Sequence, residues 1–146
     1  MEVQDFIEIA APPEGIWSFM VEPEKILEWC ITFEKFEYLS DQRSGVGTPL
    51  YIEERAGSRL MQLNFSVTEW VEHERLAFRM TSGEFVKGYE QSWTVEATPS
   101  GSRFTFWEEV KLPYGIFGRI IGLFARRVSA ATVKEMLAKL QSLAEA

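Results

Sequence analysis

Residues 85–110 have the sequence FVKGYEQSWTVEATPSGSRFTFWEEV, in which apolar and polar side chains alternate on both sides of the turn sequence TPSGS. Alternation with a period of two is typical of a half-buried β-strand, because successive side chains point to opposite faces of a sheet. Two such stretches joined by a tight turn predict an antiparallel hairpin. One face of this hairpin is rich in aromatic residues, namely Phe85, Tyr89, Trp93, Phe104 and Phe106.

The same alternation continues upstream, where residues 59–67 place Met61, Leu63 and Phe65 on one face. Turn sequences at DQRSGVG, RAGSR, EHER and SGE, together with TPSGS, divide residues 33–110 into about six strands. A further short strand is predicted at residues 3–9, VQDFIEI. Most of the chain therefore forms strands joined by short turns, which is typical of an antiparallel sheet.

Helices are predicted on either side of this block of strands. Proline tolerates the first turn of a helix, so Pro13 and Pro23 predict two short helices, the first over roughly residues 13–20. The last thirty or so residues, from near Tyr114, predict one long helix. The expected fold class is α+β, with a curved antiparallel sheet of about seven strands around the long C-terminal helix.

Composition narrows the class of protein. A chain of 146 residues fits a single domain over residues 1–146. Fifteen basic and 22 acidic residues give a net charge of −7, which argues against a nucleic-acid partner. One cysteine and one histidine exclude a disulfide scaffold and a Cys/His metal cluster, so we expect no metal and no cofactor. Neither a signal peptide nor an apolar run of ~20 residues is visible, and we expect a cytoplasmic protein.

The apolar residues of the C-terminal helix fall into two sectors that do not coincide. The sectors overlap along one line, which we expect to face the sheet; it includes Ile121, Ala125, Val128 and Thr132. Small residues above a wide aromatic sheet leave space, so this line predicts the roof of an internal cavity. Two alternatives remain open: aromatic side chains of the sheet fill the gap, or the helix breaks near residues 129–131.

Four segments resemble the START-like helix-grip superfamily (SRPBCC), which includes polyketide cyclase/dehydrase and lipid-transport-like proteins. These are IEIAAPPEGIWSFMVEPEKILEW (7–29), GVGT (45–48), VTEWVEHERLAFR (67–79) and GRIIGLFARRVSAATVKEMLAKLQSLAE (118–145). The resemblance implies a deep pocket between sheet and helix that holds a hydrophobic or amphipathic small molecule. Because the superfamily includes cyclases, hydrolase-like enzymes, carriers and ligand sensors, the fold alone does not choose among them.

Candidate pocket residues follow from the two inward faces. The strand alternation places Lys87 and Gln91 with the aromatic residues, and Glu108 with Phe104 and Phe106. A buried Glu108 would have a raised pKa and act as a general acid or base. The alternative that we favour is that Lys87 and Glu108 form a structural ion pair at the cavity rim, or lie beyond the buried part of their strands. The full ligand-binding set is Met61, Leu63, Phe65, Phe85, Lys87, Tyr89, Gln91, Trp93, Phe104, Phe106, Ile121, Ala125, Val128 and Thr132.

Three functions are compatible with these residues. The favoured one is a carrier or sensor that binds a lipid, a polyketide-like compound or another aromatic molecule. The second is a cyclase/dehydrase-type enzyme in which Glu108 is the acid or base and Gln91 or Tyr89 polarises a carbonyl. The third, which we do not favour, is an accessory protein whose cationic, apolar helix contacts a membrane or a partner, and it requires exposed Phe117 and Phe124. Both a monomer and a homodimer remain open.

Overall fold

The computed structural model describes residues 1–113 and 115–146. Its seven strands are β1 (Glu2–Ile9), β2 (Phe33–Tyr38), β3 (Pro49–Ala56), β4 (Arg59–Val71), β5 (Arg75–Gly83), β6 (Gly88–Thr98) and β7 (Gly101–Lys111). Its helices are α1 (Pro13–Ile16), α2 (Ser18–Val21), α3 (Pro23–Trp29) and α4 (Gly115–Ala144). The predicted fold class is confirmed. The predicted start of the last helix, Tyr114, lies outside the described residues.

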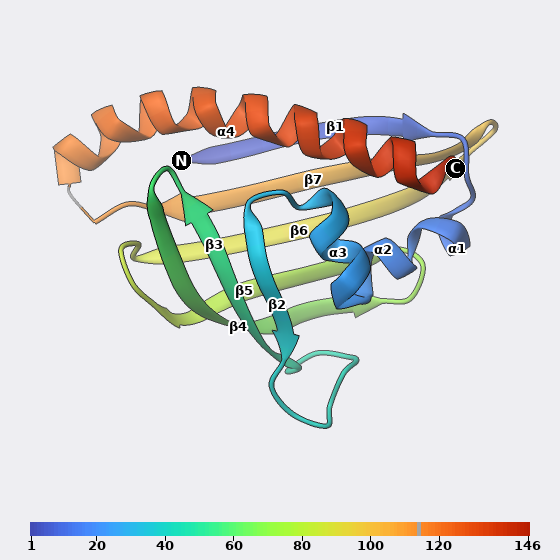
Figure 1. Cartoon of the computed structure of the whole chain (residues 1–146), viewed down its shortest axis with the longest axis horizontal. Helices are drawn as coiled ribbons and strands as arrows, with labels where there is room; N and C mark the ends of the chain where they lie inside the picture. Colours follow the sequence, from blue (N-terminus) through green and yellow to red (C-terminus); the bar gives the residue numbers. More distant parts are fainter. Residues whose placement is uncertain (114) are drawn as a thin grey trace.

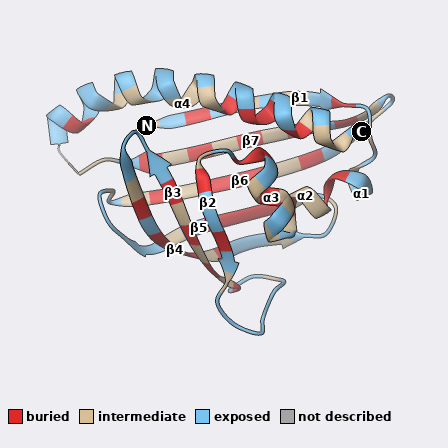
Figure 2. Ribbon diagram, in the orientation of Figure 1, coloured by how far each residue is buried: buried red, intermediate tan, exposed pale blue. Residues whose placement is uncertain are grey.

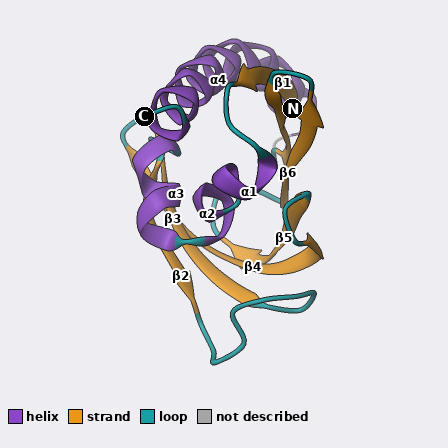
Figure 3. Ribbon diagram, turned by 90° about the vertical axis from the view of Figure 1, so that its right-hand side faces the viewer, coloured by secondary structure: helices purple, strands orange, loops and turns teal. Residues whose placement is uncertain are grey.

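The seven strands form one antiparallel sheet in the order β1-β7-β6-β5-β4-β3-β2. The sheet curls so that its concave face holds the short helices α1–α3, while α4 lies across the opening beside β1 (Figures 1 and 3). β1 joins β7 at one edge, although the two strands are separated by most of the chain. The order therefore brings the N-terminus next to the C-terminal helix.

Trp29 fills one half of the concave face. It is fully buried, and its ring packs edge-on against Trp93, Phe104 and Phe106, with centroids 5.0, 5.5 and 6.5 Å away. Its indole N–H donates to the carbonyl oxygen of Phe19 at 2.8 Å, which satisfies the polar atom that burial would otherwise leave unpaired. These contacts anchor the short helices to the sheet.

α4 packs on the sheet through its second half, so the predicted line, which also includes Met136, faces the sheet only in part. Its buried side chains are Val133, Met136, Leu137 and Leu140, whereas Ile121 is exposed. A helix of 30 residues is about 45 Å long, and the eight residues of β1 span only about 26 Å, so the first half of α4 extends beyond the strand it lies on (Figure 2). The helix is continuous from residue 115 to 144, so the break near residues 129–131 is not observed.

Two further boundaries differ from the prediction. The first short helix is divided into the single turns α1 and α2. β6 begins at Gly88 and not at Phe85, because Phe85 has a φ of 71°, outside the range of a strand. Lys87 therefore precedes the strand, and the alternation that placed it on the inward face does not reach it.

Candidate functional site

A cavity of about 710 Å³ lies in the half of the concave face that Trp29 does not fill. β6 and β7 line one side, the hairpin end of β3 and β4 lines another, and the middle turns of α4 form the roof. Much of the wall is apolar, with Met61, Phe106, Val110, Val133 and Met136 among its residues. Ala125 and Ser129 are the small residues in the part of α4 that lines this cavity.

The polar residues of the cavity are linked by hydrogen bonds whose direction is fixed. Trp93 Nε1 can only donate, and it donates to Gln91 Oε1 at 3.0 Å, which orients the Gln91 amide. Gln91 Nε2 then donates to the Tyr89 hydroxyl oxygen at 2.8 Å. The single hydroxyl hydrogen of Tyr89 goes to Glu54 Oε1 at 2.6 Å. The chain of donors starts at Trp93 and ends on the Glu54 carboxylate.

The two buried carboxyl groups of this site, Glu54 and Glu108, differ in the hydrogen bonds that they accept. Glu54 accepts from Tyr89 and, through Oε2, from the Thr32 hydroxyl at 2.8 Å. Glu108 has only two long contacts at Oε2, 3.4 Å from Tyr89 and 3.4 Å from Gln91. Within residues 1–113 and 115–146, no hydrogen bond reaches Glu108 Oε1 and no basic side chain pairs with either carboxyl group. Glu108 thus has capacity left for a ligand.

Burial and mutual repulsion shift the acid–base properties of the cluster. The Glu108 side chain is 7% exposed, and its burial, with the negative charge of Glu54 adding to it, raises its pKa to about 8. Burial also raises the pKa of Glu54, but its two hydrogen bonds oppose that shift. Burial raises the pKa of the neighbouring Cys30 thiol well above its ordinary value, and both carboxyl groups add to the effect. Glu108 is therefore mostly protonated at neutral pH.

The structure places the predicted site residues in three groups. Those that line the cavity are Met61, Phe85, Tyr89, Gln91, Phe106, Glu108, Ala125, Val128 and Thr132. Those packed in the core beyond it are Leu63, Phe65, Trp93 and Phe104. Those outside it and exposed are Lys87 and Ile121. The expected convergence of Lys87 with Glu108 does not occur, because Lys87 lies with Lys111 in a separate surface hollow.

Glu54 is the principal residue that the sequence analysis missed. It is 8% exposed and lines the cavity from β3. The signal was present in the chain, because Leu50, Ile52 and Glu54 alternate with more exposed residues and share the inward face. A glutamate at the end of that alternation is easily assigned to the solvated turn that follows it. Met136, Ser129 and Val110 also line the cavity and were not among the predicted ligand-binding residues.

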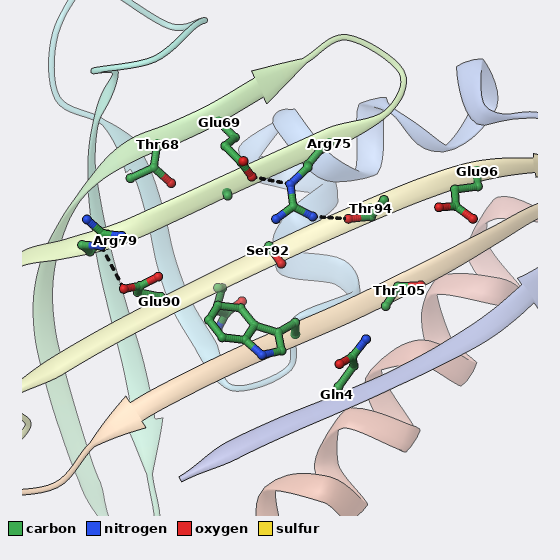
Figure 4. Close-up of a pocket in the computed structure, with 13 residues that line it drawn as sticks. Gln4, Thr68, Glu69, Arg75, Arg79, Glu90, Ser92, Thr94, Glu96 and Thr105 are labelled. Atoms are coloured by element: carbon green, nitrogen blue, oxygen red, sulfur yellow. Dashed lines mark hydrogen bonds and ion pairs between the residues drawn. The ribbon is translucent and has the colours of Figure 1, made fainter.

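A second hollow lies on the convex face of the sheet and has a different chemistry (Figure 4). Four of its charged side chains already pair with one another: Arg75 with Glu69 and Arg79 with Glu90. Arg75 also donates to the Thr94 hydroxyl at 2.7 Å. Since these four groups are already paired, the cavity beneath α4, with its apolar wall and buried polar cluster, is the better candidate for a ligand site.

The first half of α4 carries an exposed apolar surface beside the cavity. Its large side chains are Ile116, Phe117, Ile120, Ile121, Leu123, Phe124 and Val128, with Phe117 73% and Phe124 67% exposed. Residues 115–134 contain Arg119, Arg126, Arg127 and Lys134 and no acidic residue. The exposure required by the third sequence hypothesis is thus observed. Among the described residues, no helix is long and apolar enough to span a membrane.

The fold and the cavity define a class: a sheet wrapped around a long helix with a ligand-sized space between them, the START-like helix-grip fold. A family model described as "Polyketide cyclase / dehydrase and lipid transport" matches residues 1–145. The chain therefore belongs to this family, and it is a ligand-binding domain of the START/polyketide cyclase-like type. A search of the curated proteins finds no match.

Solved structures share this fold at low sequence identity. TTHA0849 from Thermus thermophilus matches with a TM-score of 0.82 and 21% identity, over 99% of this chain and 97% of the other. A START superfamily protein from Mycobacterium smegmatis matches with a TM-score of 0.78 and 16% identity, over 99% and 97%. The di-domain ARO/CYC StfQ of the steffimycin biosynthetic pathway matches with a TM-score of 0.78 and 11% identity, over 99% of this chain and 50% of StfQ.

The raised pKa of Glu108 has a measurable effect on stability. Between its ordinary value of 4.5 and about 8, the folded protein holds a proton that the unfolded chain has lost, so the free energy of unfolding falls as pH rises through this range. The expected loss is roughly 3 kcal/mol between pH 4.5 and pH 7. Glu108→Gln should remove most of this slope in urea titrations at a series of pH values.

Glu109→Gln is the matched control, because Glu109 follows on the same strand and faces away from the buried side. It should keep the slope of the unsubstituted protein. If Glu108→Gln and Glu109→Gln gave the same pH dependence, Glu108 would not be the titrating group.

Proposed function

We propose that the protein binds an amphipathic small molecule in the cavity beneath α4, as a carrier or a sensor. The observation that carries this proposal is the combination of a 710 Å³ space, an apolar wall and one cluster of polar groups at Glu54, Tyr89, Gln91 and Glu108. Ligand sites are typically apolar clefts of this size with a few placed polar groups. An apolar body would lie against the wall, and its polar end would reach the cluster.

Binding is favoured over catalysis because most hydrogens of the cluster are already committed. Tyr89 donates to Glu54, and Gln91 donates to Tyr89. Neither group has a well-placed hydrogen left to polarise a carbonyl, which the enzyme hypothesis assigned to them. Glu108 alone retains an uncommitted oxygen, and a single acid without a second positioned group makes a weak catalytic centre.

Filling the roof of the cavity tests the binding proposal. Ser129→Phe would place a ring where Ser129 lines the cavity, and overpacking of about 1–3 kcal/mol should weaken ligand binding by roughly tenfold or more. The readouts are native mass spectrometry of the purified protein, with organic extraction of any bound molecule, and titration with the apolar fluorophore phenylnaphthylamine. Ala131→Phe is the control, since Ala131 is exposed on the same helix and does not line the cavity. Equal binding by both variants would place the ligand elsewhere.

A cyclase/dehydrase-type enzyme is the second candidate, and the protonated Glu108 inside the cavity is the observation that favours it. Such an acid can transfer a proton to a ligand carbonyl or enolate, a contribution of roughly 100-fold or more to the rate.

If the enzyme hypothesis holds, Glu108→Gln should lower the rate of intramolecular aldol condensation of a linear diketone by roughly 100-fold while phenylnaphthylamine still binds. The measurement is product formation by mass spectrometry, with Glu109→Gln as control. An equal, small rate in all three proteins would reject catalysis by this residue and leave binding as the function.

The exposed first half of α4 supports a contact with a lipid bilayer, from which an amphipathic ligand would enter the cavity. Its apolar residues adjoin three arginines, and the cavity lies beside Val128. An apolar, cationic helix surface matches the interface of an anionic bilayer.

We expect the protein to co-sediment with vesicles that contain phosphatidylglycerol and not with vesicles of phosphatidylcholine alone. The double substitution Phe117→Ser and Phe124→Ser should abolish this binding, because both rings are exposed and lie on the proposed contact. Substitution of the exposed Ala131 and Ala138 by serine is the control. Binding that ignores lipid charge, or that survives the loss of both rings, would reject the contact.

A further inference from the structure

The cavity contains two buried carboxyl groups, and none of the basic side chains that the structure describes is buried beside them. Glu54 lies on β3 and Glu108 on β7, and Tyr89 of β6 contacts both. Buried charges in proteins are normally paired, because an isolated charge loses its hydration without compensation. In the empty site Glu108 therefore keeps a proton, and no described basic side chain forms a salt bridge with either carboxyl group beside the space of about 710 Å³.

The positive groups that line the cavity are engaged at its edge. Arg55 pairs with Glu34 at 2.6 Å, and Arg59 lies over the Phe85 ring, 4.1 Å from its centroid. The terminal ammonium of Met1 donates to the Val110 carbonyl oxygen at 2.9 Å. The other titratable groups that face the pair are Tyr89 and the Cys30 thiol, both neutral at physiological pH because burial raises their pKa values.

The hydrogen-bond chain distinguishes the two carboxyl groups. Glu54 accepts from Tyr89 and Thr32, so its negative charge is already stabilised by two short bonds. Glu108 has an oxygen without a hydrogen bond and lines the open space. Both carboxyl groups line the cavity, but Glu108 is the one with an oxygen free to accept a hydrogen bond from a ligand, and Glu54 lies close enough to raise its pKa.

We propose that the polar end of the ligand is a cationic amine, which pairs with Glu108 between the two carboxyl groups while the apolar body lies against α4 and β7. This proposal rests on the proposed binding function and specifies its ligand class. On binding, the Glu108 carboxyl proton leaves to solvent, and the amine keeps its own proton. The carboxylate and the ammonium then form the pair that the empty site lacks.

An amphipathic carboxylate would have the opposite effect. A third negative group beside Glu54 and Glu108 would have to take up a proton before it could be buried. An alcohol of the same length needs no change of protonation. The three headgroups therefore differ in the sign of the proton exchange that accompanies binding: release for the amine, none for the alcohol and uptake for the carboxylate.

The experiment is isothermal titration calorimetry of the full chain with dodecylamine, dodecanol and dodecanoate, at pH 7 in buffers of different ionisation enthalpy. We expect dodecylamine to release close to one proton and to bind roughly tenfold or more tightly than dodecanoate. Its affinity should rise about 50-fold from pH 6 to pH 8, because the complex requires the ionised form of a group that titrates near pH 8. Glu108→Gln should abolish the proton release and the pH dependence, whereas Glu109→Gln should keep both.

The outcomes separate the two proposals. Binding of all three compounds with equal affinity and no proton exchange overturns the amine assignment and leaves the binding function intact. Tighter binding of dodecanoate than of dodecylamine also overturns the assignment. Failure of all three to bind overturns the binding function, and the amine assignment with it. The proton count is measured on the unsubstituted protein, so the test does not depend on whether Glu108→Gln folds.

Discussion

The concave face of the curled sheet is wider than its helices can cover, and this constraint produces the site. Trp29 fills one half by packing against Trp93, Phe104 and Phe106. No comparable side chain of the described residues fills the other half, where the part of α4 that lines the cavity includes the small residues Ala125 and Ser129. The inward face of β6 changes accordingly, from Trp93 in the packed half to Gln91 and Tyr89 in the open half. The boundary between core and cavity therefore runs across single strands.

Trp93 connects the two halves, because its ring belongs to the core and its N–H begins the hydrogen-bond chain of the cavity. Because Trp93 can only donate, Gln91 accepts from it and donates to Tyr89, and Tyr89 in turn donates to the next group. The series of hydrogen bonds must therefore end on an acceptor. That acceptor is Glu54. Trp93 thus orients the Gln91 amide, which leaves the Tyr89 hydroxyl hydrogen for Glu54, and this hydrogen bond opposes the rise in the Glu54 pKa that burial causes.

Much of the fold could be predicted because period-two alternation acts strand by strand, as in residues 59–67 and 103–110. The same rule gave a wrong prediction at Lys87. The alternation of apolar and polar residues continues back to Phe85, but the positive φ of Phe85 keeps the strand from beginning before Gly88. The rule was not applied to Leu50, Ile52 and Glu54, where it would have found the second carboxyl group. The face of α4 could not be derived from its sequence alone. Which half of a long helix is buried depends on the length of the strand beneath it.

An unpaired carboxyl group in the cavity lowers the stability of the folded protein, and this loss of stability bears on the function. A packed core would replace Glu108 by an apolar residue and gain stability at neutral pH, because the buried acid must either keep a proton or carry an unpaired charge. A carrier that needed only apolar volume would have no use for two carboxyl groups. Their retention beside an apolar wall is explained if the ligand supplies the missing partner, since the free energy lost in the empty protein is then recovered on binding. If so, the lack of a positively charged partner for Glu108 in the empty site is what makes the site selective for a cationic ligand.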